Sequence, residues 1–352
     1  MARDRYTAVD ALEEIDVDYE PLRAVVDMER AVEGADGLVH EALGSNESFT
    51  WVFENGDMDA AMRDAPVLLE RRFVQQRLIP SAMEPRAVIC VPEGDSYTMY
   101  SATQIPHVLR LMLSAVTQIP EHQIRVIAPD VGGGFGSKLQ VTAEEVLCLL
   151  LARRMGRPVK WTESRSEGNM TVHHGRDQIQ RITLAAESDG RIRGLKVDLL
   201  ADMGAYLMLV TPGVPILGAF MFNAIYKMDA YSFTCRGIFT TKTPTDAYRG
   251  AGRPEATFAI ERMMDELAVE LDLDPIEVRR RNWIKHEEFP YETIAGLTYD
   301  SGNYEAATDK ALALFEYDKL RAEQADRRER RDPVQLGLGV STYTEMCGLA
   351  PS

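Results

Sequence analysis

Four glycines lie within five consecutive positions of the segment 129–138, Pro-Asp-Val-Gly-Gly-Gly-Phe-Gly-Ser-Lys. Because glycine has no Cβ, it permits positive φ and lets backbone N–H groups approach a ligand closely. The segment fails both common phosphate fingerprints, because Ser137 stands where the P-loop needs glycine and where the dinucleotide fingerprint needs glycine or alanine. We expect Gly134, Phe135 and Gly136 to present N–H donors and one fixed ring to a ligand. A backbone nest for a phosphate is the alternative within enzymes.

Two further segments carry side chains that could complete a binding site. Residues 101–106, Ser-Ala-Thr-Gln-Ile-Pro, place the amide of Gln104 at the end of a predicted strand. Residues 247–254, Ala-Tyr-Arg-Gly-Ala-Gly-Arg-Pro, put Arg249 and Arg253 in a second glycine-bearing turn before a predicted helix. An arginine fork and helix N-terminal amides favour an oxyanion. Each feature alone is typical of ordinary surface residues, but together they predict a cofactor site.

Common catalytic and metal signatures are missing from the sequence. It contains neither Gly-x-Ser-x-Gly nor His-Glu-x-x-His. His173 and His174 are adjacent, so on a strand they would face opposite sides, which favours surface or core histidines over a metal pair. The cysteines are too far apart to hold an iron–sulfur cluster or a structural zinc; they are Cys90, Cys148, Cys235 and Cys347.

The glycine segment is predicted to join a strand to a helix. Residues 123–128 are a β-branched strand that leads into it, and Thr142 with Glu145 forms a capping box for the helix that follows. That helix should end at Gly156, since Pro158 follows. Alternating apolar patterns predict further strands at 67–74, 88–91, 97–101, 159–162, 178–186 and 191–200, and one at 16–27 that leaves a small domain.

Helical patterns predict the remaining regular elements. Residues 106–118 have a broad apolar side, and proline at a first helical turn marks helices from Pro254 to about Leu271 and from Pro275 to Asn282. A short helix is expected at 57–64, and the charged run 319–332 is expected to be a solvated surface helix or linker. The mixed order of strands and helices predicts an α+β fold.

Composition restricts the classes of partner. The chain has 352 residues, 45% hydrophobic content and a net charge of −16, which suits about two globular domains. The acidic balance argues against nucleic acid or an anionic membrane as a partner. Residues 205–226 carry no charge, but Pro212, Gly213 and Pro215 interrupt them, so we expect a buried connection and no membrane span. The charged first 20 residues do not resemble a signal peptide, and we expect a cytoplasmic protein.

The combined motifs resemble one known family. Thr-Gln-Ile-Pro-His, Val-Gly-Gly-Gly-Phe-Gly-Ser-Lys and Ala-Tyr-Arg-Gly-Ala-Gly-Arg-Pro-Glu-Ala, in this order, are similar to the molybdenum-binding subunit of the xanthine dehydrogenase, aldehyde oxidase and aerobic carbon monoxide dehydrogenase family. Met-Glu-Pro-Arg at 83–86 and Gly-Arg-Pro-Val-Lys-Trp at 156–161 support the resemblance, which covers essentially the whole chain.

The resemblance implies a molybdenum hydroxylase subunit. Its cofactor would be molybdopterin with molybdenum, as the cytosine dinucleotide in many bacterial members, and its substrate an aldehyde or N-heterocycle oxidised with oxygen from water. Electrons would pass to iron–sulfur clusters and FAD on partner subunits of a hetero-oligomer. The implied catalytic residues are Gln104, Phe135 and Arg249. The implied cofactor-binding residues are Gln104, Gly133, Gly134, Phe135, Gly136, Ala247, Arg249 and Gly250, with no protein side chain ligating the metal directly.

Three features of the sequence depart from the family's patterns. Carbon monoxide dehydrogenases carry a copper-ligating cysteine where this chain has Gly250, which disfavours the copper-dependent reaction. Purine-oxidising relatives carry glutamate after the loop lysine, where this chain has Leu139. The family's catalytic base is a glutamate in a C-terminal half that residues 1–352 do not contain, and Glu345 is not placed to replace it.

The resemblance also predicts the domain organisation. Residues 1–65 would be the end of a small hammerhead-like α/β domain with a linker, 66–330 the first molybdopterin-binding domain, and 331–352 the start of a second one. The missing C-terminal half would then be a partner, and the isolated chain would be inactive. A non-catalytic relic or assembly partner with the same fold is the alternative outside enzymes.

Overall fold

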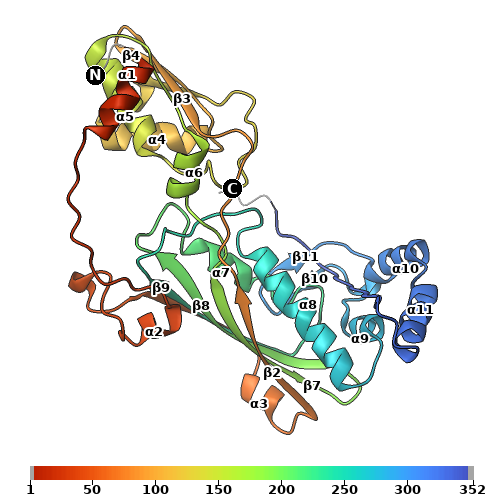
Figure 1. Cartoon of the computed structure of the whole chain (residues 1–352). Coiled ribbons are helices and arrows are strands. Elements are labelled where there is room, and N and C mark those ends of the chain that lie inside the picture. Colours follow the sequence, from red (N-terminus) through yellow and green to blue (C-terminus); the bar gives the residue numbers. More distant parts are fainter. Residues whose placement is uncertain (1–3, 348–352) are drawn as a thin grey trace.

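The computed structural model describes residues 4–347 and shows two lobes joined by a narrow connection (Figure 1). The lower lobe contains a five-stranded sheet in the order β1-β9-β8-β7-β2. The upper lobe contains a four-stranded sheet in the order β5-β4-β3-β6. Strands β2 (Val67–Gln75) and β7 (Gln178–Ala186) pair along their full lengths, from Val67 with Ala186 to Gln75 with Gln178. The upper lobe is therefore an insertion between two neighbouring strands of the lower sheet.

The lower sheet is covered on both faces. Its other strands are β1 (Glu47–Asn55), β8 (Ile192–Gly204) and β9 (Ala230–Phe239), and β8 pairs with β9 in parallel. Helix α8 (Arg253–Glu270) packs one apolar side, with Ile260, Met263 and Leu267, into the large core of this lobe. The short helices α2 (Met28–Val32) and α3 (Met58–Met62) lie against β8 and β9.

The upper sheet packs against helices α4 (Pro106–Thr117) and α5 (Ala143–Met155). Its strands are β3 (Ala87–Glu93), β4 (Ser96–Ser101), β5 (Ile124–Ile127) and β6 (Val159–Thr162). Leu109, Leu113 and Leu149 are fully buried between helices and sheet. Helix α6 (Arg165–Thr171) then leads back towards the lower lobe.

The remaining elements lie at the periphery. Helices α9 (Pro275–Asn282), α10 (Tyr304–Phe315) and α11 (Tyr317–Glu329) follow α8, with the short strands β10 (Tyr291–Glu292) and β11 (Thr298–Tyr299) between them. Three 3-10 turns lie at Glu41–Leu43, Glu121–Gln123 and His286–Glu288. Helix α1 (Arg5–Glu13) has no buried residue and is drawn at the upper lobe.

Most predicted elements are confirmed, including the α+β class, the capping box at Thr142 and the left-handed end of α5 at Gly156. The predicted strand at 16–27 is wrong: the segment is extended but forms no strand pairing within residues 4–347. Alternation in sequence cannot make a strand without a partner edge. Strands β1, β9, β10 and β11 and helices α1, α2, α6, α7 and α10 were not predicted.

The uncharged segment 205–226 contains only the short helix α7 (Gly213–Ala219) and turns, many of whose residues are buried. Within residues 4–347, no helix is long and apolar enough to span a bilayer. The charged run 319–332 forms the surface helix α11, as predicted.

Candidate functional site

The three segments singled out in the sequence meet where the two lobes touch. Gln104 follows β4 and the glycine loop follows β5, so both belong to the upper lobe. Arg249 lies in the turn before α8 in the lower lobe. The Arg249 N–H donates a hydrogen bond to the Phe135 carbonyl across 3.0 Å, which joins the two lobes directly.

The amide of Gln104 is held in one orientation. Its side-chain Oε1 accepts hydrogen bonds from the backbone N–H groups of Gly136 at 2.9 Å and Lys138 at 3.3 Å. The backbone N–H of Gln104 donates to the Lys138 carbonyl at 2.9 Å. Because the acceptor oxygen is occupied by backbone donors, the Nε2 amino group is the free end of the amide. Gln104 is exposed, and its Nε2 has no hydrogen-bond partner within residues 4–347.

Glycine is required in the loop because other groups approach its backbone closely. A Cβ on Gly134 would lie 2.3 Å from Gln104 Oε1, and one on Gly136 would lie 1.9 Å from the Ala247 carbonyl oxygen. Gly136 also has φ +99°, a conformation that side chains rarely adopt. These two glycines let the Gln104 side chain and the lower lobe contact the loop.

Phe135 is placed by an unusual backbone. Its φ of +53° is left-handed, which costs a non-glycine residue free energy and marks a constrained position. The bond from Arg249 N–H holds the Phe135 carbonyl, and the Arg249 guanidinium carbon lies 5.9 Å from the centre of the ring. Phe135 remains 44% exposed. Its ring and the exposed Arg249 side chain therefore stand at the surface of the junction.

Lys138 has an internal role. Its side chain is only 1% exposed, and its ammonium group pairs with Glu84 Oε2 at 2.6 Å. The same carboxylate oxygen accepts the Gly132 N–H at 2.8 Å. The hydrogen bond from Lys138 and, to a smaller degree, that from Gly132 lower the pKa of Glu84. Lys138 thus anchors the loop and does not face a phosphate, unlike a P-loop lysine.

Two details of the predicted site are wrong. The Gly136 N–H is not a free donor, because Gln104 accepts it, whereas the N–H groups of Gly134 and Phe135 have no acceptor among the described residues. Arg253 does not join Arg249 in an arginine fork: its guanidinium donates to the carbonyls of Gly250 and Met346 and is buried. Sequence spacing could not show that Arg253 turns back onto the helix start.

His173 is a site residue that the sequence did not identify. It is 2% exposed, and its Nε2 lies 2.9 Å from the Ala247 carbonyl oxygen, the same atom that Gly136 contacts. Burial is the largest effect and lowers the pKa of His173, so the ring is the neutral donor of this bond. His174 instead lies beside Arg77, at 3.3 Å, so the two histidines serve different partners, as their adjacency predicted. No cluster of His, Cys, Asp and Glu suited to a metal ion occurs among the described residues.

The exposed groups of the junction have a common chemical character. They are hydrogen-bond donors and one aromatic ring: Gln104 Nε2, the N–H groups of Gly134 and Phe135, the Phe135 ring and the Arg249 guanidinium. Such a set suits a flat ligand rich in acceptor oxygens and negative charge. A molybdenum centre carried on a pterin, which needs no protein ligand to the metal, fits these residues.

Known proteins resemble this chain along most of its length. A family model described as the molybdopterin cofactor-binding domain matches residues 39–283. The carbon monoxide dehydrogenase large chain of Hydrogenophaga pseudoflava is 36% identical over 100% of this chain and 46% of its own length. The 6-hydroxypseudooxynicotine dehydrogenase complex subunit gamma of Paenarthrobacter nicotinovorans is 32% identical over 99% of this chain and 44% of its own length.

Solved structures agree with the sequence comparison. Quinoline 2-oxidoreductase from Pseudomonas putida 86 superposes with a TM-score of 0.86 at 33% identity, over 94% of this chain and 42% of that one. The chain spans less than half the length of these relatives. It belongs to the molybdopterin cofactor-binding domain family that includes the large subunits of molybdenum-dependent oxidoreductases.

Proposed function

We propose that this chain supplies the first molybdopterin-binding half of a molybdenum hydroxylase that oxidises an aldehyde or an N-heterocycle. The observation that carries the proposal is the fixed amide of Gln104, whose oxygen is held by Gly136 and Lys138 and whose amino group is free. It contacts the loop that carries Phe135, whose exposed ring lies near the Arg249 guanidinium. We assign Gln104, Phe135 and Arg249 to the reacting face, and Gly133, Gly134, Gly136, Ala247 and Gly250 to the walls around the cofactor.

Each residue has a role that follows from its geometry. When bound, the molybdopterin cofactor, in its cytosine dinucleotide form, would supply two-electron redox chemistry at its metal. The Gln104 amino group would donate a hydrogen bond to an oxygen of that centre, and the free N–H groups of Gly134 and Phe135 would orient it. The net reaction converts R–H and water into R–OH, two protons and two electrons. The electrons leave for iron–sulfur and FAD subunits.

The backbone at Gly250 supports carbon hydroxylation over the copper-dependent oxidation of carbon monoxide. Gly250 has φ +92°, and a Cβ there would lie 2.3 Å from Pro254 Cγ. A cysteine at this position would require a different turn. Leu139 in place of a carboxylate likewise disfavours a purine substrate.

The domain boundaries at 65 and 330 belong to the same proposal. Residues 335–347 run extended with alternating burial, and their backbone forms no backbone hydrogen bond within the described part of the chain. Side chains hold them instead, as where Arg279 donates to the Val340 carbonyl at 3.2 Å. This arrangement suits the first strand of a second domain, which would also bring the catalytic glutamate. We expect no turnover without that half.

Metal analysis of the complex tests the proposal. The chain is co-produced with the remaining half of the large subunit and with iron–sulfur and FAD subunits, and molybdenum is quantified in the purified assembly. Absence of molybdenum would leave the non-catalytic alternative. Reduction of the metal centre by benzaldehyde and by quinoline is then followed by stopped flow.

The variant Gln104→Glu sharpens the test. Glutamate keeps an acceptor for Gly136 and Lys138 but replaces the outward amino group. We expect normal molybdenum content and a reduction rate lower by about 100-fold, the usual loss when one oriented donor is removed. The control Gln123→Glu makes the same chemical change in the same lobe, where the side chain has no hydrogen bond among the described residues. Equal rates in the two variants would show that the assignment of Gln104 is wrong.

A further inference from the structure

Two segments that lie side by side join the two sheets, and residues 14–27 separately link α1 to α2 at the edge of the molecule (Figure 1). The chain leaves the lower sheet after Gln75 and returns at Gln178. Leu78 and Gly175 form an isolated antiparallel bridge between the outgoing and returning segments, with hydrogen bonds of 3.1 and 2.8 Å. We call residues 76–78 and 174–177 the neck. Because the cofactor-binding residues come from both lobes, the neck sets the spacing between the two walls of the site.

The returning segment of the neck is strained. Arg176 and Asp177 have φ values of +64° and +58°, two consecutive left-handed residues that are not glycine. Such a conformation persists only where surrounding contacts over-determine it. The structure provides these contacts on both residues.

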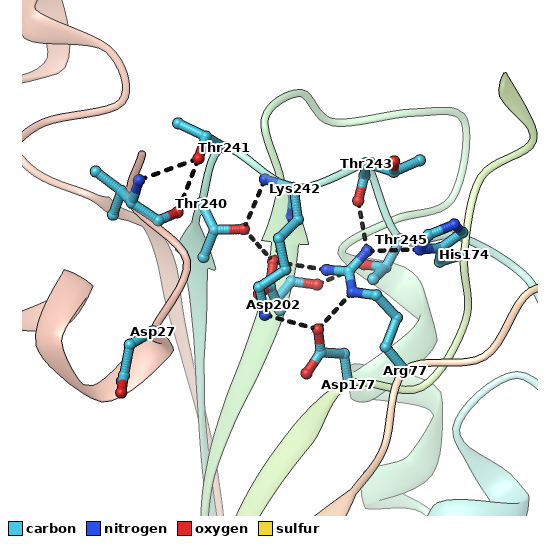
Figure 2. A network of polar contacts seen from close by, with 12 residues as sticks. Asp27, Arg77, His174, Asp177, Asp202, Thr240, Thr241, Lys242, Thr243 and Thr245 are labelled. Carbon is cyan, nitrogen blue, oxygen red and sulfur yellow. Dashed lines mark hydrogen bonds and ion pairs between the residues drawn. The ribbon is translucent and has the colours of Figure 1, made fainter. Parts of the chain in front are cut away.

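A largely buried ion-pair network, with Asp202 at its fully buried end, holds Asp177 (Figure 2). Arg77 Nε pairs with Asp177 Oδ2 at 2.6 Å, and Lys242 Nζ pairs with the same oxygen at 3.0 Å. Both cations also pair with Asp202, Arg77 at 3.0 Å and Lys242 at 2.7 Å, and the Asp202 side chain is 0% exposed. Arg77 further donates to the Thr243 carbonyl at 2.5 Å. Two carboxylates and two cations thus link the outgoing neck, the returning neck, β8 and the segment after β9.

Asp202 is tied into the lower lobe by further bonds. Its Oδ1 accepts the Thr240 hydroxyl at 2.7 Å and the Gly204 N–H at 2.7 Å, and its carbonyl accepts the Thr245 hydroxyl at 2.5 Å. A fully buried carboxylate that pairs with two cations and accepts two hydrogen bonds at one oxygen has few alternative arrangements. The network is therefore a fixed point on the lower lobe to which the neck is attached.

Arg176 connects the neck to the site. Its Nη2 donates to the Arg249 carbonyl at 2.8 Å, its Nη1 pairs with Glu255 at 3.1 Å, and its guanidinium lies 4.7 Å from the centre of the Tyr248 ring. His174 lies two residues earlier in the neck. Its backbone N–H donates to the Pro244 carbonyl, and its backbone carbonyl accepts the Asp246 N–H at 2.8 Å. The neck is thus attached to the same turn that carries Arg249.

We propose that Arg77 and Asp177 are positioning residues of the cofactor site. By clamping the left-handed turn at 176–177, they hold Arg176 on the carbonyls of Tyr248 and Arg249, the two peptides that flank Arg249, and so keep the Arg249 N–H against the Phe135 carbonyl. The inference rests on the proposed function, because only a cofactor site makes Arg77 and Asp177 positioning residues. The contact that they control is nevertheless present in the protein chain itself. Its direct readout is the N–H of Arg249, whose acceptor is the Phe135 carbonyl in the other lobe.

Hydrogen–deuterium exchange of the 352-residue chain tests the proposal without cofactor or activity. In Arg77→Met and in Asp177→Asn, we expect the Arg249 amide to exchange about tenfold faster or more than in the wild type. Asparagine tolerates the left-handed conformation, so Asp177→Asn removes charge without new strain. The amide of Leu195, a fully buried residue of β8, should keep its wild-type rate. Arg110→Met breaks the half-exposed Arg110–Glu121 pair in the upper lobe and should change neither rate.

The inference would be overturned if the Arg249 amide of a folded Arg77→Met protein exchanged at the wild-type rate, or if its rate changed only as much as in Arg110→Met. It would also be overturned if exchange at Leu195 accelerated equally, because that would indicate a general loss of stability. If Arg77→Met does not fold, Lys242→Met decides the question, because it removes one cation and leaves Arg77 in place; the same selective but smaller acceleration is expected. Molybdenum content plays no part in this readout, so failure of the clamp and failure of the proposed function are distinguishable.

Discussion

Gly136→Ala should disrupt the contact between the lobes at the centre of the site. The added Cβ would lie 1.9 Å from the Ala247 carbonyl oxygen and 3.2 Å from Tyr248 Cα, and both atoms belong to the backbone. The carbonyl cannot turn away freely, because His173 donates to it from a buried position. A left-handed alanine costs about 1–2 kcal/mol, and forcing packed backbone apart costs about 1–3 kcal/mol more. We therefore expect a loss of about 2–5 kcal/mol in unfolding free energy.

Urea denaturation of Gly136→Ala beside Gly156→Ala separates these two costs. Gly156 ends α5 in the same lobe with φ +60°, and a Cβ there would meet nothing within 4 Å. The control therefore loses only the conformational part, about 1 kcal/mol. A Gly136→Ala protein that is no less stable than Gly156→Ala would refute the reasoning, because the Ala247 carbonyl would then not be a fixed wall.

Two further predictions concern the turn at Gly250 and the buried histidine. Gly250→Cys should lower the unfolding free energy by about 2 kcal/mol or more, because of the left-handed φ and the contact with Pro254; it should not give a copper-binding complex, and stoichiometric copper by metal analysis would contradict this. Burial lowers the pKa of His173 in the folded chain below its ordinary value of about 6.5. The unfolded chain therefore binds the proton more tightly than the folded chain does. Stability from this residue is complete above that pH and is lost as the pH falls through the folded pKa, by up to about 1.4 kcal/mol between pH 6.5 and 5.5. His173→Gln, which retains an N–H donor, should show a smaller loss of stability between pH 7.5 and 5.5 in urea titrations; an equal loss would show that His173 is not the titrating group.

The local elements around the site could be predicted because their signals are themselves local. Thr142 and Glu145 cap the helix that begins at Ala143, and Gly156 ends it in the left-handed conformation. Proline in the first turn marked α8 and α9 in the same way. These signals depend on hydrogen bonds within a few residues, so the rest of the fold does not alter them.

The pairing of distant segments could not be predicted. Residues 16–27 alternate like a strand but find no partner edge, whereas β9 was not recognised although it lies inside the lower sheet, between β1 and β8. Arg253 looked equivalent to Arg249, yet it is buried and holds Gly250 and Met346. In each case the outcome depends on residues far away in the sequence, which spacing and periodicity do not describe.

The sequence by itself identified a glycine loop, an amide and an arginine turn as the candidate site, because glycine, glutamine and arginine have few substitutes in the roles expected of them. The tertiary structure decided how they are used. It assigns Gln104 Oε1 to the loop and leaves Nε2 free, turns Lys138 inward onto Glu84, and sets Gly136 against the Ala247 carbonyl. It also brings the two segments of the neck together and pairs Arg77 with Asp177. These choices depend on which donor reaches which acceptor across the junction between the lobes, and only the folded chain fixes those distances.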